Sequence, residues 1–140
     1  MNDKTLIMEA FKARESSYSP YSNFMVGAAL LAKNGTVYHG CNIENAAYTP
    51  TNCAERTAFF KAVSDGIYDF TAIAVVGAPK GTKPEDFGYA YPCGVCRQVM
   101  MEFCSPTDFR IITAKSTDEY IACTLEEMLP HGFGPNDLNK

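Results

Sequence analysis

The sequence lacks a long apolar run. No hydrophobic stretch approaches the roughly 20 residues that a helix needs to cross a bilayer, so we expect neither a membrane-spanning helix nor a membrane partner. The first residues, Met1 to Lys4, are polar and lead into an amphipathic pattern, and we therefore expect no signal peptide. Together these absences predict a protein that works in the cytoplasm.

The chain also lacks a cluster of basic residues. Its 12 Lys and Arg are scattered among 16 Asp and Glu, and the formal net charge is −4. Binding a phosphate backbone requires clustered positive charge, so this balance disfavours nucleic acid and suits a small or neutral substrate. No internal repeat or low-complexity tract divides the sequence, which predicts a single domain over residues 1–140 with its own hydrophobic core.

What the sequence contains is an alternation of helix and strand patterns. Apolar spacing predicts an amphipathic helix over 5–15, and Asn34-Gly35 is typical of the turn between two hairpin strands within 25–43. The later elements that we expect are a helix over 51–64, a fully apolar strand over 71–78, a helix over 93–104, a strand over 109–114 and a short capped helix over 124–130.

This element order predicts an α/β fold. We expect a three-layer α/β/α arrangement, in which a mixed sheet of about five strands opens with an antiparallel hairpin and carries helices on both faces. The sequence pattern does not determine how the strands after the hairpin pair with one another.

Three of the six cysteines lie at predicted helix starts. Cys93 and Cys96 form a CxxC pair at one helix start, and Cys53 lies at another. A CxxC pair alone fits a redox couple, half of a zinc site or chance. The third cysteine favours a metal, because two helix dipoles can offset the charge of three thiolates, and Arg56 and Arg97 could add positive charge.

Glu55 gives this candidate metal site a possible chemistry. Three thiolates leave the fourth position of a tetrahedral Zn²⁺ open for a water, whose pKa the metal lowers to about 7. Glu55, two residues after Cys53, could take the proton of that water and return it to a substrate. Cys-x-Glu followed by Pro-Cys-x-x-Cys matches the signature of zinc-dependent nucleobase deaminases.

Simpler interpretations exist for the same residues. Glu55 could be a helix-start acid that favours the dipole, and a closed structural zinc site could replace the open one. The residues that could complete a closed site are Cys41, Cys104, Cys123 and His39. Otherwise Cys104 and Cys123 would be packed small hydrophobes, and His39 a surface or structural residue.

Over nearly its whole length, the chain resembles the small cytidine deaminases that have an all-cysteine zinc site and assemble as homotetramers. The matching segments are SYSPYSNFMVGAALL, GCNIENAAY, NCAERTA, PCGVCRQ and MLPHGFGPNDL. The resemblance implies an enzyme of pyrimidine salvage that uses one Zn²⁺ per subunit. It would hydrolyse cytidine and deoxycytidine to uridine and deoxyuridine plus ammonia.

The resemblance also implies a role for each residue of the metal motifs. Cys53, Cys93 and Cys96 would bind the zinc ion, and Glu55 would move the proton. Arg56 would donate hydrogen bonds to the zinc thiolates and temper their charge.

Other matching residues would bind the nucleoside. Asn42 and Glu44 would hold the ribose hydroxyls, and Phe24 would pack on the pyrimidine ring. The backbone of Ala54 would help to read the edge of the ring. Phe133 would reach into the site of a neighbouring subunit, so that sites lie at the interfaces of the homotetramer.

Three alternative functions remain open at this point. One is a deaminase of another small aminopyrimidine, of the blasticidin type, although the segment 42–45 favours a ribose-bearing substrate. Another is a polynucleotide-editing deaminase, which the charge and the chain length disfavour. A non-enzymatic zinc-binding module is the third, and it would require a fourth protein ligand.

Overall fold

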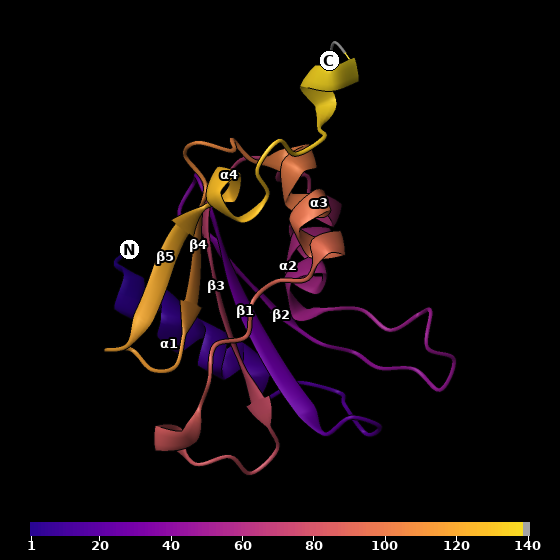
Figure 1. The fold of residues 1–140 in the computed structure, drawn as a ribbon, viewed down its shortest axis with the longest axis vertical. Helices are drawn as coiled ribbons and strands as arrows, with labels where there is room; N and C mark the ends of the chain where they lie inside the picture. The colour runs from indigo at the N-terminus through magenta and orange to yellow at the C-terminus, as the bar shows by residue number, and fades with distance from the viewer. Residues whose placement is uncertain (139–140) are drawn as a thin grey trace.

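The computed structural model describes residues 1–138 and contains a five-stranded mixed sheet (Figure 1). The strand order is β2-β1-β3-β4-β5, and neighbouring strands are antiparallel except for the parallel pair β3–β4. The elements in chain order are α1 (Asp3–Arg14), β1 (Phe24–Ala32), β2 (Val37–Cys41), α2 (Ala54–Ser64), β3 (Phe70–Pro79), η1 (Pro84–Asp86), α3 (Gly94–Phe103), β4 (Arg110–Ala114), β5 (Tyr120–Thr124), α4 (Leu125–Met128) and η2 (Pro135–Leu138).

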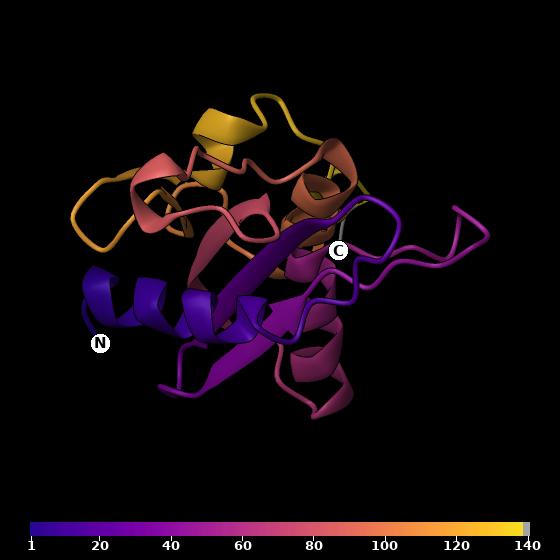
Figure 2. The same ribbon diagram turned by 90° about the horizontal axis from the view of Figure 1, so that it is seen from below.

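Helices cover both faces of this sheet, which confirms the predicted three-layer fold. Helix α1 lies on one face, and α2 and α3 lie on the other (Figures 1 and 2). Ile7 and Ala10 of α1 pack with Ala74 of β3, whereas Phe59 of α2 packs on the opposite face with Ile73. Over the described residues, no helix is long and apolar enough to span a membrane.

Two glycines let helices lie directly on the sheet. A Cβ atom added to Gly27 of β1 would stand 2.2 Å from the carbonyl oxygen of Ala10 in α1. A Cβ atom on Gly40 of β2 would stand 2.2 Å from the carbonyl oxygen of Ala54, at the start of α2. Side chains at these positions would overlap helix backbone, so the glycines set the height of α1 and α2 above the sheet.

The start of α2 differs from the predicted start. The helix begins at Ala54 rather than near residue 51, because the backbone of Asn52 is engaged elsewhere. Asn52 and Ile43 exchange two backbone hydrogen bonds of 2.9 Å, which form an isolated antiparallel bridge. Tyr18 forms a second bridge to Ile43, so the loops 15–23 and 42–53 lie side by side at one end of the sheet.

Strand β5 has no counterpart among the elements located from the sequence. It pairs antiparallel with β4 at the edge of the sheet, from Tyr120 to Thr124. Much of this short strand is exposed, so its residues lack the apolar alternation by which a half-buried strand is predicted. The capping box at Thr124 and Glu127, in contrast, is present as predicted.

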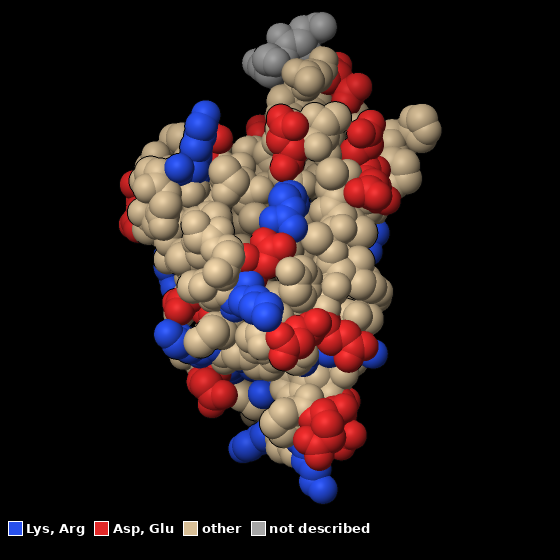
Figure 3. Space-filling model, turned by 90° about the vertical axis from the view of Figure 1, so that its left-hand side faces the viewer, with Lys and Arg blue, Asp and Glu red and all other residues tan. Residues whose placement is uncertain are grey.

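Charges of both signs are interspersed on the side of the molecule where β5 lies (Figure 3). Two ion pairs involve β4 and the residues that follow it. Arg110 of β4 donates two hydrogen bonds, of 2.7 and 2.8 Å, to the carboxylate of Asp3 at the start of α1. Lys115 lies 3.5 Å from Glu119 across the turn between β4 and β5. The first pair anchors the amino end of α1 to the sheet.

Candidate metal and catalytic site

Two helices point their amino ends at one cluster of thiols. Cys53 is the N-cap of α2, Cys93 is the N-cap of α3, and Cys96 lies in the first turn of α3. The Sγ atoms of Cys53 and Cys93 are 3.8 Å apart, and those of Cys93 and Cys96 are 3.5 Å apart. Two thiolates on one tetrahedral zinc, with bonds of about 2.3 Å, would lie about 3.8 Å apart. The spacing therefore fits a single zinc ion.

The other candidate ligands do not join this cluster. Among residues 1–138, no fourth cysteine, histidine or carboxylate belongs to the group whose ligand atoms lie within 4.8 Å of one another. Cys41 donates to the carbonyl of Ser16, Cys104 is buried in the core and His39 pairs with Glu9 at 2.8 Å. The described residues thus provide three thiol ligands, which is the number expected of an open site.

Hydrogen bonds polarise the thiols. The bond with Cys96 and the one donated by Arg56 Nη2, at 3.3 Å, hold the pKa of Cys53 well below its usual value. The same bond with Cys53, together with burial, raises the pKa of Cys96. Arg56 is itself held in its charged form, because its hydrogen bond to Cys53 raises its pKa. This thiolate-favouring donor set, with a guanidinium beside it, is chemically suited to a zinc ion.

Glu55 is buried next to the thiols. Its side chain lies in the first turn of α2, and the residue is 4% exposed. Burial raises the pKa of Glu55 to about 7, and the negative charge of Cys53 acts in the same direction. A carboxyl group with such a pKa can accept and donate a proton near neutral pH. The structure thus places an ionisable carboxyl group beside the metal-capable cluster.

Arg97 does not join the thiols, contrary to the suggestion from the sequence that it could add charge there. Its Nε donates to the carbonyl of Pro92 at 2.8 Å, and its Nη1 donates to the carbonyl of Met128 at 2.6 Å. The planar fork of guanidinium donors thus reaches two backbone carbonyls rather than a sulfur atom. Arg97 therefore ties the start of α3 to the end of α4.

The predicted ring-binding residues lie at the starts of β1 and α2. Phe24 is the first residue of β1 and is 39% exposed, so it is not the core aromatic that its strand position alone would favour. Ala54 is the first residue of α2 and is fully buried. Both residues belong to elements that meet the loops 15–23 and 42–53.

Asn42 and Glu44 have a structural role that was not predicted. Asn42 Oδ1 accepts the backbone N–H of Val26 at 2.9 Å, and its Nδ2 donates to the carbonyl of Phe24 at 2.7 Å. Glu44 accepts backbone N–H groups of Tyr21 and Ser22 at 3.0 and 3.1 Å. The Ser22 hydroxyl also donates to Glu44 and lowers its pKa. These two side chains hold the loop before β1 in place.

The backbone of Phe133 is tied to the middle of α3. Its carbonyl accepts a hydrogen bond of 2.8 Å from Nε2 of Gln98, in the middle of α3, and its side chain is 56% exposed. The cysteines lie at the amino end of α3, whereas the carboxy-terminal segment passes beyond its other end (Figure 1). Sequence reasoning missed Gln98 as an anchor, although it directly follows the CxxC motif and an arginine.

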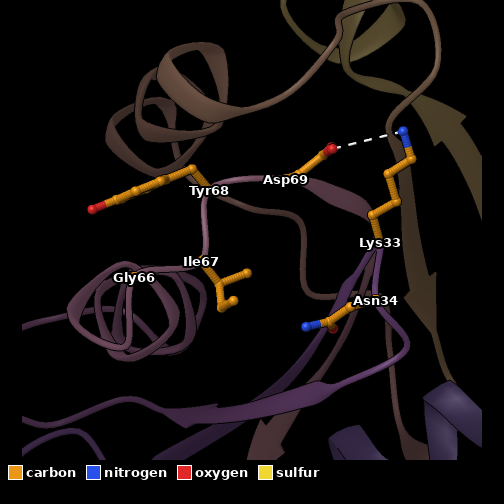
Figure 4. A pocket seen from close by; sticks show the side chains of 6 residues that line it. All are labelled: Lys33, Asn34, Gly66, Ile67, Tyr68 and Asp69. Carbon is orange, nitrogen blue, oxygen red and sulfur yellow. Dashed lines mark ion pairs between the residues drawn. The ribbon is translucent and has the colours of Figure 1, made fainter.

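A separate hollow lies at the opposite end of α2. It is formed between the β1–β2 turn and the α2–β3 loop, where Lys33 and Asp69 form an ion pair of 3.7 Å (Figure 4). The remaining lining residues are Asn34, Gly66, Ile67 and Tyr68, and the Tyr68 side chain points away from the ion pair. No residue of the predicted site contributes to this hollow.

Comparison with known proteins gives a consistent picture. The family model of the cytidine and deoxycytidylate deaminase zinc-binding region matches residues 1–112. The chain is 50% identical to a cytidine deaminase from Sporosarcina psychrophila over 139 residues. This alignment covers 99% of this chain and 96% of the relative. The identity to a cytidine deaminase from Halalkalibacterium halodurans is also 50%, over 99% of each chain.

Solved structures agree with this result. The crystal structure of cytidine deaminase from Burkholderia pseudomallei superposes with a TM-score of 0.84 and is 44% identical, covering 95% of this chain and all of the other. The cytidine deaminase from Mycobacterium tuberculosis gives a TM-score of 0.78 at 32% identity, over 96% of this chain and 98% of that one. Both likenesses extend over nearly the whole chain.

Proposed function

We propose that this chain, which belongs to the family of the cytidine and deoxycytidylate deaminase zinc-binding region, catalyses the hydrolytic deamination of cytidine and deoxycytidine. The products would be uridine or deoxyuridine and ammonia, in pyrimidine salvage. The observation that carries the proposal is the open cluster of three thiols beside the buried Glu55. The names of relatives at 50% identity over 99% of the chain support the choice of substrate.

Cys53, Cys93 and Cys96 would hold one zinc ion per chain. When bound, zinc supplies Lewis-acid activation of water near neutral pH. Arg56 would stay hydrogen-bonded to Cys53 and offset part of the thiolate charge. The amino ends of α2 and α3 would offset a further part, since helix dipoles place partial positive charge there.

Glu55 would move the proton of the reaction. Its carboxylate would accept a proton from the attacking water and deliver it to N3 of the pyrimidine. It would then transfer the second proton to the amino group that leaves from C4 as ammonia. The pKa of about 7 supports both directions of transfer, because neither protonation state is strongly disfavoured.

The nucleoside would be held by the residues around the two loops. Phe24 would pack on the pyrimidine ring, and the backbone of Ala54 would contact its edge. Asn42 and Glu44 would bind the ribose hydroxyls. The Asn42 amide has a second N–H beyond the one that bonds Phe24, and the Glu44 carboxylate has further acceptor sites. These residues would thus shape the loop and bind the sugar at the same time.

The proton role can be tested with Glu55→Gln, which keeps the size of the side chain. We expect this variant to retain zinc and to lose about 10²–10⁴-fold in kcat, the usual worth of general acid–base catalysis. Cytidine turnover would be followed by ultraviolet absorbance and zinc content by atomic spectroscopy. Glu9→Gln, on the opposite face of the sheet, is the matched control and should retain full activity.

Two results would contradict the proposal in different ways. Near-normal turnover by Glu55→Gln would remove Glu55 from the mechanism but leave the activity in place. A zinc-loaded wild-type chain that leaves both cytidine and deoxycytidine unchanged would refute the proposed function itself.

We also propose a homotetramer with active sites at subunit interfaces. Large aromatic side chains project from the loop and tail segments, with Tyr48 at 88% exposure and Phe133 at 56%. Such aromatic residues are typical of the buried centres of interfaces. The Phe133 side chain is free to contact another subunit, since only the backbone of this residue is bound by Gln98 and more than half of its surface is exposed.

We infer that the chain is one domain and works in the cytoplasm. The five named strands all belong to one sheet, which supports the single domain. All six cysteines are unpaired in the structure, which suits a reducing compartment.

A further inference from the structure

Arg14, at the end of α1, is a buried charge that the proposed reaction does not use. The residue is 9% exposed, and within residues 1–138 no carboxylate forms an ion pair with it. Its hydrogen-bond partners are backbone carbonyls instead. A buried guanidinium is costly unless such groups satisfy it, so the arrangement of these carbonyls deserves an explanation.

The carbonyls that bind Arg14 belong to two different strands. Arg14 Nε donates to the carbonyl of Met25 at 2.9 Å, on β1. Arg14 Nη2 donates to the carbonyls of Ala78 and Pro79 at 2.8 and 3.2 Å, on β3. Met25 is paired with Ala78 in the ladder between the strands. The guanidinium therefore bridges the two strands at the end of their ladder.

The chain brings Arg14 to this point through two further contacts. A Cβ on Gly27 would stand 2.4 Å from the backbone nitrogen of Arg14, so the glycine allows the end of α1 to approach β1. The ring of Phe87 lies on the guanidinium, with its centroid 4.8 Å from Cζ. Such a cation–π contact shields the charge while the donors remain directed at the carbonyls.

Phe24 lies directly beside this bridge. It immediately precedes Met25, and it pairs with Pro79 in the same ladder. Its own carbonyl accepts a hydrogen bond from Asn42. The ring edge of Phe24 would lie 3.1 Å from a Cβ on Gly77, so the ring rests over β3 where that strand has no side chain.

We propose that Arg14 is a positioning residue, which joins the ends of β1 and β3 from the α1 face of the sheet. By fixing this strand end, it orients the Phe24 ring on the opposite face for contact with the pyrimidine. The inference rests on the proposed function only for the contact between Phe24 and substrate. A ring that binds the base equally in ground and transition states affects KM more than kcat, and Arg14 should share that signature.

A double-mutant cycle tests whether Arg14 acts through Phe24. For Arg14→Met we expect KM for cytidine to rise about tenfold and kcat to change little. This effect is smaller than the roughly 10²-fold loss of rate that a displacement of 1 Å can cause. In a Phe24→Ala background the same substitution should change KM by less than about twofold, because coupled residues are not additive. Arg14→Lys should restore part of the loss, since an ammonium group can still donate to these carbonyls.

Arg110→Met is the matched control for this cycle. It removes the other arginine that anchors α1, at the opposite end of the helix, without touching the Phe24 strand end. We expect it to leave KM unchanged. The proposal would be overturned if Arg14→Met raised KM by the same factor in the wild-type and Phe24→Ala backgrounds. An increase in KM of the same size in Arg110→Met would also overturn it.

A second readout does not depend on turnover. The sequence contains no tryptophan, so Phe24→Trp introduces a single fluorescent reporter. Combining it with Arg14→Met should increase quenching of the reporter by acrylamide, whereas quenching of a Phe60→Trp reporter on α2 should not change. Equal changes in both reporters would indicate general loosening and would overturn the positioning role.

The remaining outcomes also decide the question. If neither Arg14→Met nor Arg14→Lys folds, Arg14 is a core residue and the positioning role is overturned. An inactive wild-type chain would refute the proposed function, and the two reporters would still test the positioning role.

Discussion

The contact between Gly40 and α2 allows a quantitative prediction about zinc binding. A Cβ on Gly40 would stand 2.2 Å from the carbonyl oxygen of Ala54 and 2.5 Å from the backbone nitrogen of Ala58. Ordinary contacts begin at 3.4 Å, so Gly40→Ala requires the strand and the helix to separate by about 1.2 Å at the first of these contacts. Both neighbours are backbone atoms, so rotation of a side chain cannot relieve the overlap.

This separation should displace Cys53, the N-cap of α2, relative to Cys93 and Cys96 on α3. Zinc–sulfur bonds of about 2.3 Å do not tolerate a shift of that size without loss of geometry. We expect zinc affinity to fall about 10–100-fold, as for other disturbances of the groups that hold metal ligands. The overpacking should also cost about 1–3 kcal/mol of folding free energy.

Gly27→Ala is the control for the loss of stability. Its Cβ would stand 2.2 Å from the carbonyl oxygen of Ala10, an overlap of the same size on the opposite face of the sheet. Urea denaturation would measure the stability of both variants, and competition with a chelating dye would measure their zinc affinity. We expect both variants to be destabilised and Gly40→Ala alone to lose affinity. Wild-type zinc affinity in a destabilised Gly40→Ala variant would refute the reasoning.

Two further predictions concern the assembly and the pH dependence of stability. If Phe133 completes a neighbouring site, mixed assemblies of Phe133→Ala and Glu55→Gln chains should be more active than the two variants assayed separately. Light scattering should give the mass of four chains. No gain in activity on mixing would place Phe133 in its own chain's site. The hydrogen bonds from Arg110 hold the pKa of Asp3 below its ordinary value of 3.8. This ion pair therefore stabilises the fold fully above pH 3.8, and its contribution is lost as the pH falls through the lowered pKa. Asp3→Asn should therefore cost about 1 kcal/mol or less at neutral pH and progressively less in acid, as urea denaturation would show; a cost that is independent of pH would contradict the ion-pair explanation.

Much of the candidate site could be predicted from the sequence because its parts are local. The spacing Cys-x-Glu and the pair Cys-x-x-Cys place chemistry at the starts of helices, where a few neighbouring residues decide the backbone conformation. The cluster of Cys53, Cys93 and Cys96 confirms that prediction. The roles of Asn42 and Phe24 in binding substrate came from the family resemblance, and they remain predictions.

Other features could not be derived from local patterns. Arg97 was a candidate for the charge near the thiols, but it binds one carbonyl just before α3 and another at the end of α4. Arg14 was part of an amphipathic pattern without a special role, and its partners on β3 are 64 and 65 residues away. Nothing near an arginine in the sequence reveals which distant carbonyls it will meet.

Elements that depend on short-range interactions could be located from the order of residues alone. These include the amphipathic α1, the turn at Asn34-Gly35, the buried strand β3 and the capping box before α4, since periodicity and backbone preference operate over a few residues.

The long-range arrangement, in contrast, is visible only in the folded chain. In the fold, β3 pairs with β4 in parallel and β5 lies at the edge of the sheet. Residues 53 and 93 meet although 40 positions of sequence separate them. The physical reason is that the same apolar pattern can be buried in several strand orders, and the packing of whole elements selects among them.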